Sequence, residues 1–192
     1  GLGILSIGAV GIGIANGRGS SSSADSANTT ADTALEKIAN YADLNTNPAP
    51  TVQDYLDAGI IGVDAANLAA VNAKVDAVAK VDADTVPEVQ ALADAGNTTA
   101  DTALEKIANY ADSNTNPAPT VQDYLDAGIT GVDAANLNAV NAKVDAVAKT
   151  DADTVPEVQA LVDAGNITAD TALAKIANYA DSNTNPAPTV QD

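Results

Sequence analysis

One polar loop occurs three times in the chain with residue types and spacing that could bind calcium. In its second occurrence it reads DSNTNPAPTVQD, with oxygen-bearing groups at positions 1, 3, 5, 7, 9 and 12: Asp112, Asn114, Asn116, the Ala118 carbonyl, Thr120 and Asp123. An EF-hand loop supplies its Ca²⁺ ligands from these positions. The equivalent groups of the other two loops are Asp43, Asn45, Asn47, Ala49, Thr51 and Asp54, and Asp181, Asn183, Asn185, Ala187, Thr189 and Asp192.

The same loop has features that oppose a calcium site. Position 6 is Pro117, whose ring fixes φ near −65°, whereas an EF-hand loop needs glycine at this sharp turn. Position 12 is an aspartate rather than the bidentate glutamate. Helix caps and Asx turns explain the Asp, Asn and Thr residues without a metal. We therefore assign no metal ligand and leave calcium as the minor alternative.

The remaining residues offer little for catalysis. Asp151, Asp153 and Glu157 form a second acidic cluster, which we interpret as a solvated loop followed by a capping box. The chain has no Cys or His, which removes the usual zinc ligands, nucleophile and proton shuttle. No phosphate-binding loop is present, and no carboxylate pair stands out as belonging to a pocket. We expect no enzyme, no cofactor and no small-molecule substrate.

The five tyrosines are the only aromatic residues, and they favour packing over ligand binding. A packed tyrosine buries its ring and commonly leaves its hydroxyl in water. We expect this of Tyr41, Tyr55, Tyr110, Tyr124 and Tyr179.

The formal net charge of −18 is spread evenly along the chain. Nucleic-acid binding requires clustered Lys and Arg to neutralise phosphates, and no such cluster is present. The acidity therefore excludes nucleic acid as a partner and is compatible with solubility in a salty medium and weak cation binding.

The chain repeats with a period of 69 residues. One copy runs from Ala31 to Thr99, the second from Ala100 to Thr168, and a partial third from Ala169 to Asp192. The two full copies differ at only six positions: Leu44/Ser113, Ile61/Thr130, Ala69/Asn138, Val81/Thr150, Ala93/Val162 and Thr98/Ile167. Repetition of this kind suits a rod or a multivalent surface, because each copy adds length or another weak contact. Because the chain lacks Met and ends inside a copy, we expect it to be a piece of a longer polypeptide.

Each copy is predicted to form four short helices. The first covers residues 30–42 with Thr30 as its cap, and the second begins at Thr51 and ends at Gly59. The third starts at Asp64 and carries an apolar stripe of Leu68, Val71, Val75 and Val78. The fourth opens with a capping box at Thr85–Glu88 and stops at Gly96. The short joint GNTT at residues 96–99 suggests limited freedom between copies, although its glycine could act as a hinge.

The predicted fold class is therefore all-α, with tandem 69-residue four-helix repeats in a helical bundle array or a solenoid. Its core consists mostly of Ala, Val and Leu, which bury little apolar area each, so one copy alone would be marginally stable. Stacking of neighbouring copies would add buried surface. Whether the copies stack rigidly or form separate beads stays open.

An apolar, glycine-rich segment precedes the repeats. Residues 1–15 contain no charge, and residues 16–30 resemble a flexible Gly/Ser linker that includes Arg18. The apolar run is short for a membrane helix, and its alternation also fits a strand. Exposed apolar surface of this kind is unfavourable in water. We expect it to be buried in a membrane, an outer-membrane channel or a neighbouring subunit.

The repeat phrase NPAPTVQDYLDAGITGVDAANLNAVNAKVDAVAKTDADTVPEVQALVDAG resembles repeats of large surface adhesins that Gram-negative bacteria export by type I secretion, of the biofilm-associated and RTX types. The last three helices of each copy also resemble GA modules. These resemblances imply an extracellular, cell-surface protein that acts as a stalk or matrix fibre in adhesion or biofilm. The alternatives are a filament or sheath subunit that polymerises through its apolar N-terminal segment, and a GA-like module that binds a host protein.

Overall fold

The computed structural model describes residues 22–44, 46–112, 115–180 and 186–190. Within these ranges the secondary structure is helical and contains no strand, which confirms the all-α prediction. The α-helices are α1 (Ser22–Tyr41), α2 (Val52–Asp57), α3 (Leu68–Asp76), α4 (Val86–Tyr110), α5 (Val121–Asp126), α6 (Leu137–Asp145) and α7 (Val155–Ala180). Two 3₁₀ turns, Lys80–Asp82 and Lys149–Asp151, precede α4 and α7.

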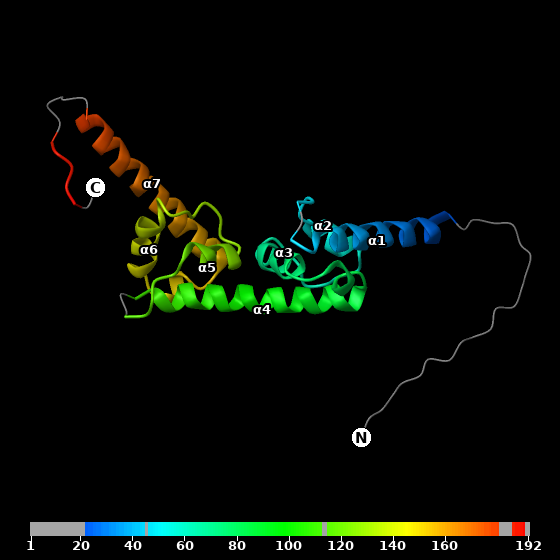
Figure 1. Ribbon diagram of the computed structural model, residues 1–192. Coiled ribbons are helices and arrows are strands. Elements are labelled where there is room, and N and C mark those ends of the chain that lie inside the picture. Colours follow the sequence, from blue (N-terminus) through cyan, green and yellow to red (C-terminus); the bar gives the residue numbers. More distant parts are fainter. Residues whose placement is uncertain (1–21, 45, 113–114, 181–185, 191–192) are drawn as a thin grey trace, which may run out of the picture.

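The other helices lie in two groups, one along each half of α4 (Figure 1), and each group encloses one cluster of buried side chains. The first core is built from α1, α2, α3 and the start of α4, and consists of Ala34, Ile38, Ala42, Tyr55, Ala58, Ile60, Val71, Val75, Ala83, Val89 and Ala93. The second core uses the residues 69 positions later: Ala103, Ile107, Ala111, Tyr124, Ala127, Ile129, Val140, Val144, Ala152, Val158 and Val162. The apolar stripe predicted for the third helix faces the first core, because Val71 and Val75 are buried and Leu68 and Val78 pack against them.

A single helix, α4, belongs to both cores. Val89 and Ala93 near its start lie in the first core, and Ala103 and Ile107 near its end lie in the second. The predicted helix end at Gly96 is therefore wrong, and the predicted joint at residues 96–99 is part of a continuous 25-residue helix. The boundary between sequence copies, at Thr99 and Ala100, falls inside this helix.

Gly96 has a packing role rather than a helix-ending one. A Cβ atom added at this position would lie 2.6 Å from the Cα atom of Val71, so no side chain fits between α4 and α3. Gly165 in α7 has the same relation to Val140 in α6, with 2.8 Å between the added Cβ and Cα. Glycine destabilises a helix by roughly 1 kcal/mol relative to alanine. At these two positions it lets the backbones of two helices approach closely, and the resulting packing is favourable.

Two predicted helix starts also differ from the structure. Helix α1 begins at Ser22, so Thr30 lies inside it and the predicted linker over residues 16–30 overlaps its first turns. Helix α3 begins at Leu68 instead of Asp64. The Asp64 carboxylate accepts hydrogen bonds from the backbone N–H groups of Ala66 (2.8 Å) and Asn67 (3.2 Å), and this Asx turn replaces the first helical turn.

The predicted capping boxes are confirmed. The Glu88 carboxylate accepts hydrogen bonds from the Thr85 backbone N–H (3.1 Å) and hydroxyl (2.6 Å) at the start of α4. Gly59 follows α2 in the left-handed conformation with φ of +81°, as expected of a glycine after a helix C-terminus.

The apolar segment that we expect to be buried, residues 1–15, lies outside the described residues. Among those that are described, no helix is both long and apolar enough to cross a membrane.

The continuity of α4 predicts a fixed geometry between the two cores. Spin labels on Cys residues at the exposed positions Val81 and Thr150, in an otherwise cysteine-free chain, should give one narrow distance distribution by pulsed electron paramagnetic resonance. Thr98→Pro should broaden it, because proline inside a helix removes a hydrogen bond and costs about 3 kcal/mol. Thr98→Ile should leave it narrow, because α7 already holds Ile167 at the equivalent position. A broad distribution in the unmodified chain would contradict a rigid shared helix.

Candidate functional site

The polar loop between α1 and α2 is held by hydrogen bonds to the neighbouring parts of the chain. Asp43 lies in the left-handed region with φ of +73°, and its N–H donates to the Val78 carbonyl (2.8 Å). The Asn47 side-chain amide donates to the Asn40 carbonyl at the end of α1 (2.6 Å). Asn116 and Asn109 repeat this bond at the same distance after α4. Two of the residues considered as calcium ligands therefore shape the loop.

The last carboxylate of the loop, Asp54, is occupied by three donors. One of its oxygens accepts hydrogen bonds from the Thr51 N–H and hydroxyl (both 2.7 Å) and from the Lys37 ammonium of α1 (2.6 Å). Partial burial would raise the pKa of Asp54, but the bonds from Lys37 and Thr51 outweigh this and hold the pKa below its ordinary value. The pair Lys106 and Asp123 repeats the contact at 2.5 Å. The sequence predicts the capping role of Asp54 but not its ion pair to the preceding helix.

The described polar groups of the loop are hydrogen-bonded within the protein. Among the described residues, no group of three or more Asp or Glu side chains is arranged so that it could hold a metal ion. Asn45 and Asn114 lie outside the described residues. In the second acidic cluster, Glu157 accepts from the Thr154 N–H (3.1 Å) and hydroxyl (2.6 Å), as a capping box requires, while Asp151 ends the 3₁₀ turn before α7.

A buried polar network crosses each core. The Tyr55 hydroxyl donates to the Asn72 side-chain oxygen (2.7 Å), and the Asn72 amide donates to the Pro50 carbonyl (2.9 Å). The second core repeats this with Tyr124, Asn141 and Pro119, at 2.7 and 3.0 Å. The network ties the proline of the loop to α2 and α3 in the first core, and to α5 and α6 in the second.

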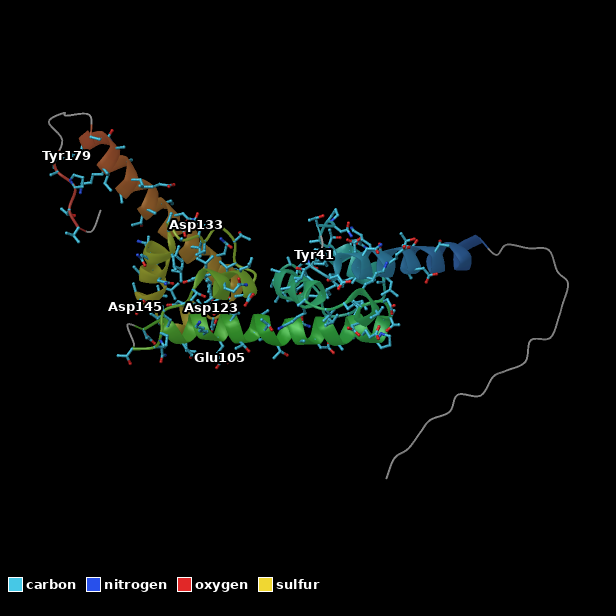
Figure 2. All side chains as sticks on the ribbon, in the orientation of Figure 1. Tyr41, Glu105, Asp123, Asp133, Asp145 and Tyr179 are labelled. Carbon is cyan, nitrogen blue, oxygen red and sulfur yellow. The ribbon has the colours of Figure 1, made fainter. Side chains whose placement is uncertain are left out.

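The tyrosines do not all follow the expectation of a hydroxyl in water. Tyr55 and Tyr124 are fully buried, with their hydroxyls bonded to asparagine. Tyr41 and Tyr110 are partly buried against the cores, and Tyr179 is exposed near the end of α7 (Figure 2). Burial, together with the neighbouring Tyr41 and Asp54, raises the pKa of Tyr55 far above its ordinary value of 10. The pKa of Tyr124 is raised in the same way, by burial and by Tyr110 and Asp123.

The surface hollows recur with the sequence period. A groove of about 310 Å³ between α1 and α2 is lined by Thr33, Lys37, Asp54 and Asp57, and its equivalent of about 230 Å³ between α4 and α5 by Thr102, Lys106, Asp123 and Asp126. Each mixes threonine hydroxyls, one ammonium group and two carboxylates. Both grooves are open to solvent, so they lack the enclosure typical of small-molecule sites.

The most specific feature of the surface is the contact between the two cores. Gly128, with φ of +75°, follows α5 and lies directly against the Ala66 carbonyl of the preceding copy, which an added Cβ would overlap. Beside this contact is a cavity of about 290 Å³, lined from both copies and from α4 by Asp64, Ala66, Asn67, Asn97, Ala100, Asp101, Leu104, Ala127 and Val155. A Cβ atom added at Gly59, the equivalent of Gly128 in the first copy, would meet nothing within 4 Å.

The local sequence permits α4 to continue past Gly96 but does not require it. Asn97, Thr98 and Thr99 after Gly96 are weak helix formers, but the sequence GNTTADTALEKIA contains no proline and can continue a helix. A glycine within such a stretch marks close backbone approach as readily as a helix end. The contact between Gly128 and Ala66, by contrast, follows from the arrangement of the two cores along α4 and has no local signal.

Comparison with known proteins identifies no relative. No protein-family model, curated protein or solved structure matches the chain.

The buried tyrosines predict a loss of stability at alkaline pH. Their pKa values are raised in the folded state, so their stabilising effect is complete below pH 10 and is lost as the pH rises toward the folded-state pKa. Above the tyrosine pKa of the unfolded chain, each of the two tyrosines should lower the free energy of unfolding by up to about 1.4 kcal/mol per pH unit. Urea unfolding followed by circular dichroism, between about pH 8 and about pH 11 so as to bracket the ordinary tyrosine pKa, measures this decline.

Tyr124→Phe is the matched variant. It should be less stable by about 1–3 kcal/mol at neutral pH, because Asn141 loses its buried donor, and it should lose less stability at alkaline pH. Tyr179→Phe, at an exposed position, should change neither quantity. If Tyr124→Phe loses as much stability at alkaline pH as the unmodified chain does, then this tyrosine is not buried.

The pair Gly59 and Gly128 isolates the contact between the cores. Alanine at either position must adopt a positive φ, which costs about 1–2 kcal/mol. Only Gly128→Ala also meets the Ala66 carbonyl, so it should destabilise the chain more than Gly59→Ala and should alter the distance between labels at positions 81 and 150. Equal effects of the two substitutions on unfolding and on this distance would show that the cores do not touch at Gly128.

Proposed function

We propose that the chain is a structural, extracellular repeat protein that serves as a stalk or matrix fibre in cell adhesion or biofilm. Its role would be mechanical: to hold something at a distance from a cell surface, or to bridge between cells. Each 69-residue copy would be one four-helix unit of a tandem array.

The observation that carries the proposal is the helix shared by the two cores. A flexible linker would let consecutive units fold back on each other, whereas α4 carries Val89 of the first core and Ile107 of the second on one continuous rod. An α-helix rises 1.5 Å per residue, so the 25 residues of α4 span about 37 Å. Repeating this connection adds a fixed increment of length for each copy.

The chemistry of the surface supports the same role. The net charge of −18 disfavours collapse of the chain and association with other acidic surfaces. The described grooves are open to solvent and recur with the sequence period, as weak multivalent contacts would require. None of them brings together a nucleophile, a base and an enclosed pocket, so we propose no enzymatic activity.

The resemblance of the repeat phrase to type I-secreted adhesins of Gram-negative bacteria supplies the proposed location, the cell surface. In this proposal the apolar segment at residues 1–15 is the part buried in a membrane, an outer-membrane channel or a neighbouring subunit, and protein surfaces are the partners.

Immunogold labelling of the source organism tests both location and length. Antibody against the repeat should label intact cells, and deletion of one whole copy, Ala100–Thr168, should bring the label closer to the envelope and reduce biofilm mass. This deletion leaves every remaining junction with its native sequence, so folding of the other copies should be unaffected. Label that requires permeabilised cells, or a label height that the deletion does not change, would contradict the proposal.

A further inference from the structure

The cavity between the two cores has an acidic edge and an apolar wall. Figure 1 shows α3 and α5 side by side over the middle of α4, and the cavity of about 290 Å³ lies at this junction. Ala100 is buried and Leu104 and Val155 are half-buried in its wall, whereas Asp64 and Asp101 are exposed and therefore lie toward solvent. Among the described residues, no Lys or Arg lines it.

The two carboxylates at this edge have no cationic partner within the described part of the chain. Asp64 uses one oxygen, Oδ1, to accept the two backbone hydrogen bonds of its Asx turn. Both ion pairs of the described residues use other carboxylates, those of Asp54 and Asp123. In a chain with a net charge of −18, the exposed and unpaired Asp64 and Asp101 attract a cation from solution.

A third polar group beside the cavity lacks a donor. The Asn67 amide donates to the Gly62 carbonyl (2.8 Å), and the buried side-chain oxygen of Asn97 accepts from no described residue. In the second copy the equivalent oxygen, that of Asn166, accepts from the Asn136 amide (2.6 Å). A buried acceptor without a donor is unfavourable, so an N–H group that reaches Asn97 stabilises the site. Because this oxygen is closed to solvent, the Asn97 amide must turn toward the cavity to receive it.

These features select a hydrocarbon chain that carries ammonium groups. An ammonium group has three donors and no acceptor, which matches two carboxylates and an amide oxygen. Methylene groups gain free energy when they leave water for the wall formed by Ala100, Leu104 and Val155. A hard metal ion binds through oxygen ligands and gains nothing from such a wall.

We propose that this cavity binds a linear aliphatic polyamine. One ammonium group pairs with Asp64 and another with Asp101, and the methylene chain between them lies against the apolar wall. Asp64 precedes α3 of the first core, Asp101 belongs to the shared helix α4, and Ala127 and Val155 belong to the second copy. One ligand therefore contacts both copies and stabilises the contact between their cores. This inference does not rest on the proposed function.

Isothermal titration calorimetry of the full chain with spermidine tests the site. Asp64→Asn and Asp101→Asn should each weaken saturable binding by about tenfold, because each removes one charge-assisted hydrogen bond. Asn at position 64 keeps an oxygen for the Asx turn, so the fold should be retained. The matched control is Glu105→Gln, which removes an exposed carboxylate of the same helix that does not line the cavity (Figure 2). It should leave the affinity unchanged.

Ala100→Leu separates the cavity from general attraction between charges. The larger side chain should occupy part of the cavity while every carboxylate remains, so spermidine binding should be lost although the helical circular dichroism is retained. Spermidine should raise the urea midpoint of the unmodified chain and leave that of Ala100→Leu unchanged.

Three results would overturn the proposal. The first is the absence of saturable spermidine binding to the unmodified chain. The second is an equal loss of affinity in Glu105→Gln and Asp101→Asn, or undiminished binding in folded Ala100→Leu, because spermidine would then bind through the overall charge alone. The third is binding of Mg²⁺ as tight as that of spermidine, because the apolar wall would then contribute nothing.

Discussion

The close approach of α3 to α4 at Gly96 is the constraint on which the rest of the structure depends. The backbone of Val71 occupies the space that any side chain at position 96 would need. This contact fixes the depth at which α3 packs, and it forms at the middle of α4, between the residues that serve the first core and those that serve the second. The equivalent glycine of α7, Gly165, lies against Val140 of α6 in the same way. Both cores are therefore anchored to their helices in the same way.

Small side chains make this arrangement necessary. A core in which alanine and valine predominate gains little from each residue, so its helices must lie close together to bury enough area. Sharing α4 lets one helix contribute apolar surface to two cores. Each core also contains one buried polar network. In the first core, this network joins Tyr55 to Asn72 and Asn72 to the Pro50 carbonyl by hydrogen bonds. Such networks favour one packing arrangement over others, because any alternative would leave buried polar groups without partners.

Local sequence signals predict the helices and their caps but not how they are joined. Thr85 and Glu88 define a helix start through contacts within one turn, and the stripe of Val71 and Val75 has a helical period that only a core-facing surface explains. The prediction at Gly96 is wrong because the role of this glycine depends on a helix about 25 residues away in the sequence, which a local pattern does not contain. The same reason applies to the candidate site: the cap at Asp54 is predictable from Thr51, whereas Lys37 and the contact between Gly128 and Ala66 depend on tertiary packing.

The shared helix also converts residue number into angular position. Each residue of an α-helix turns the chain by about 100° and advances it by 1.5 Å. The direction in which the second core projects from α4 is therefore set by the number of residues between Gly96 and Ile107. An insertion or deletion of one residue there would leave both cores intact but rotate one about the other by more than a quarter of a turn. Length variation that a flexible linker tolerates would here change how the second core is oriented relative to the first, so a constant number of residues between Gly96 and Ile107 is a requirement of this geometry.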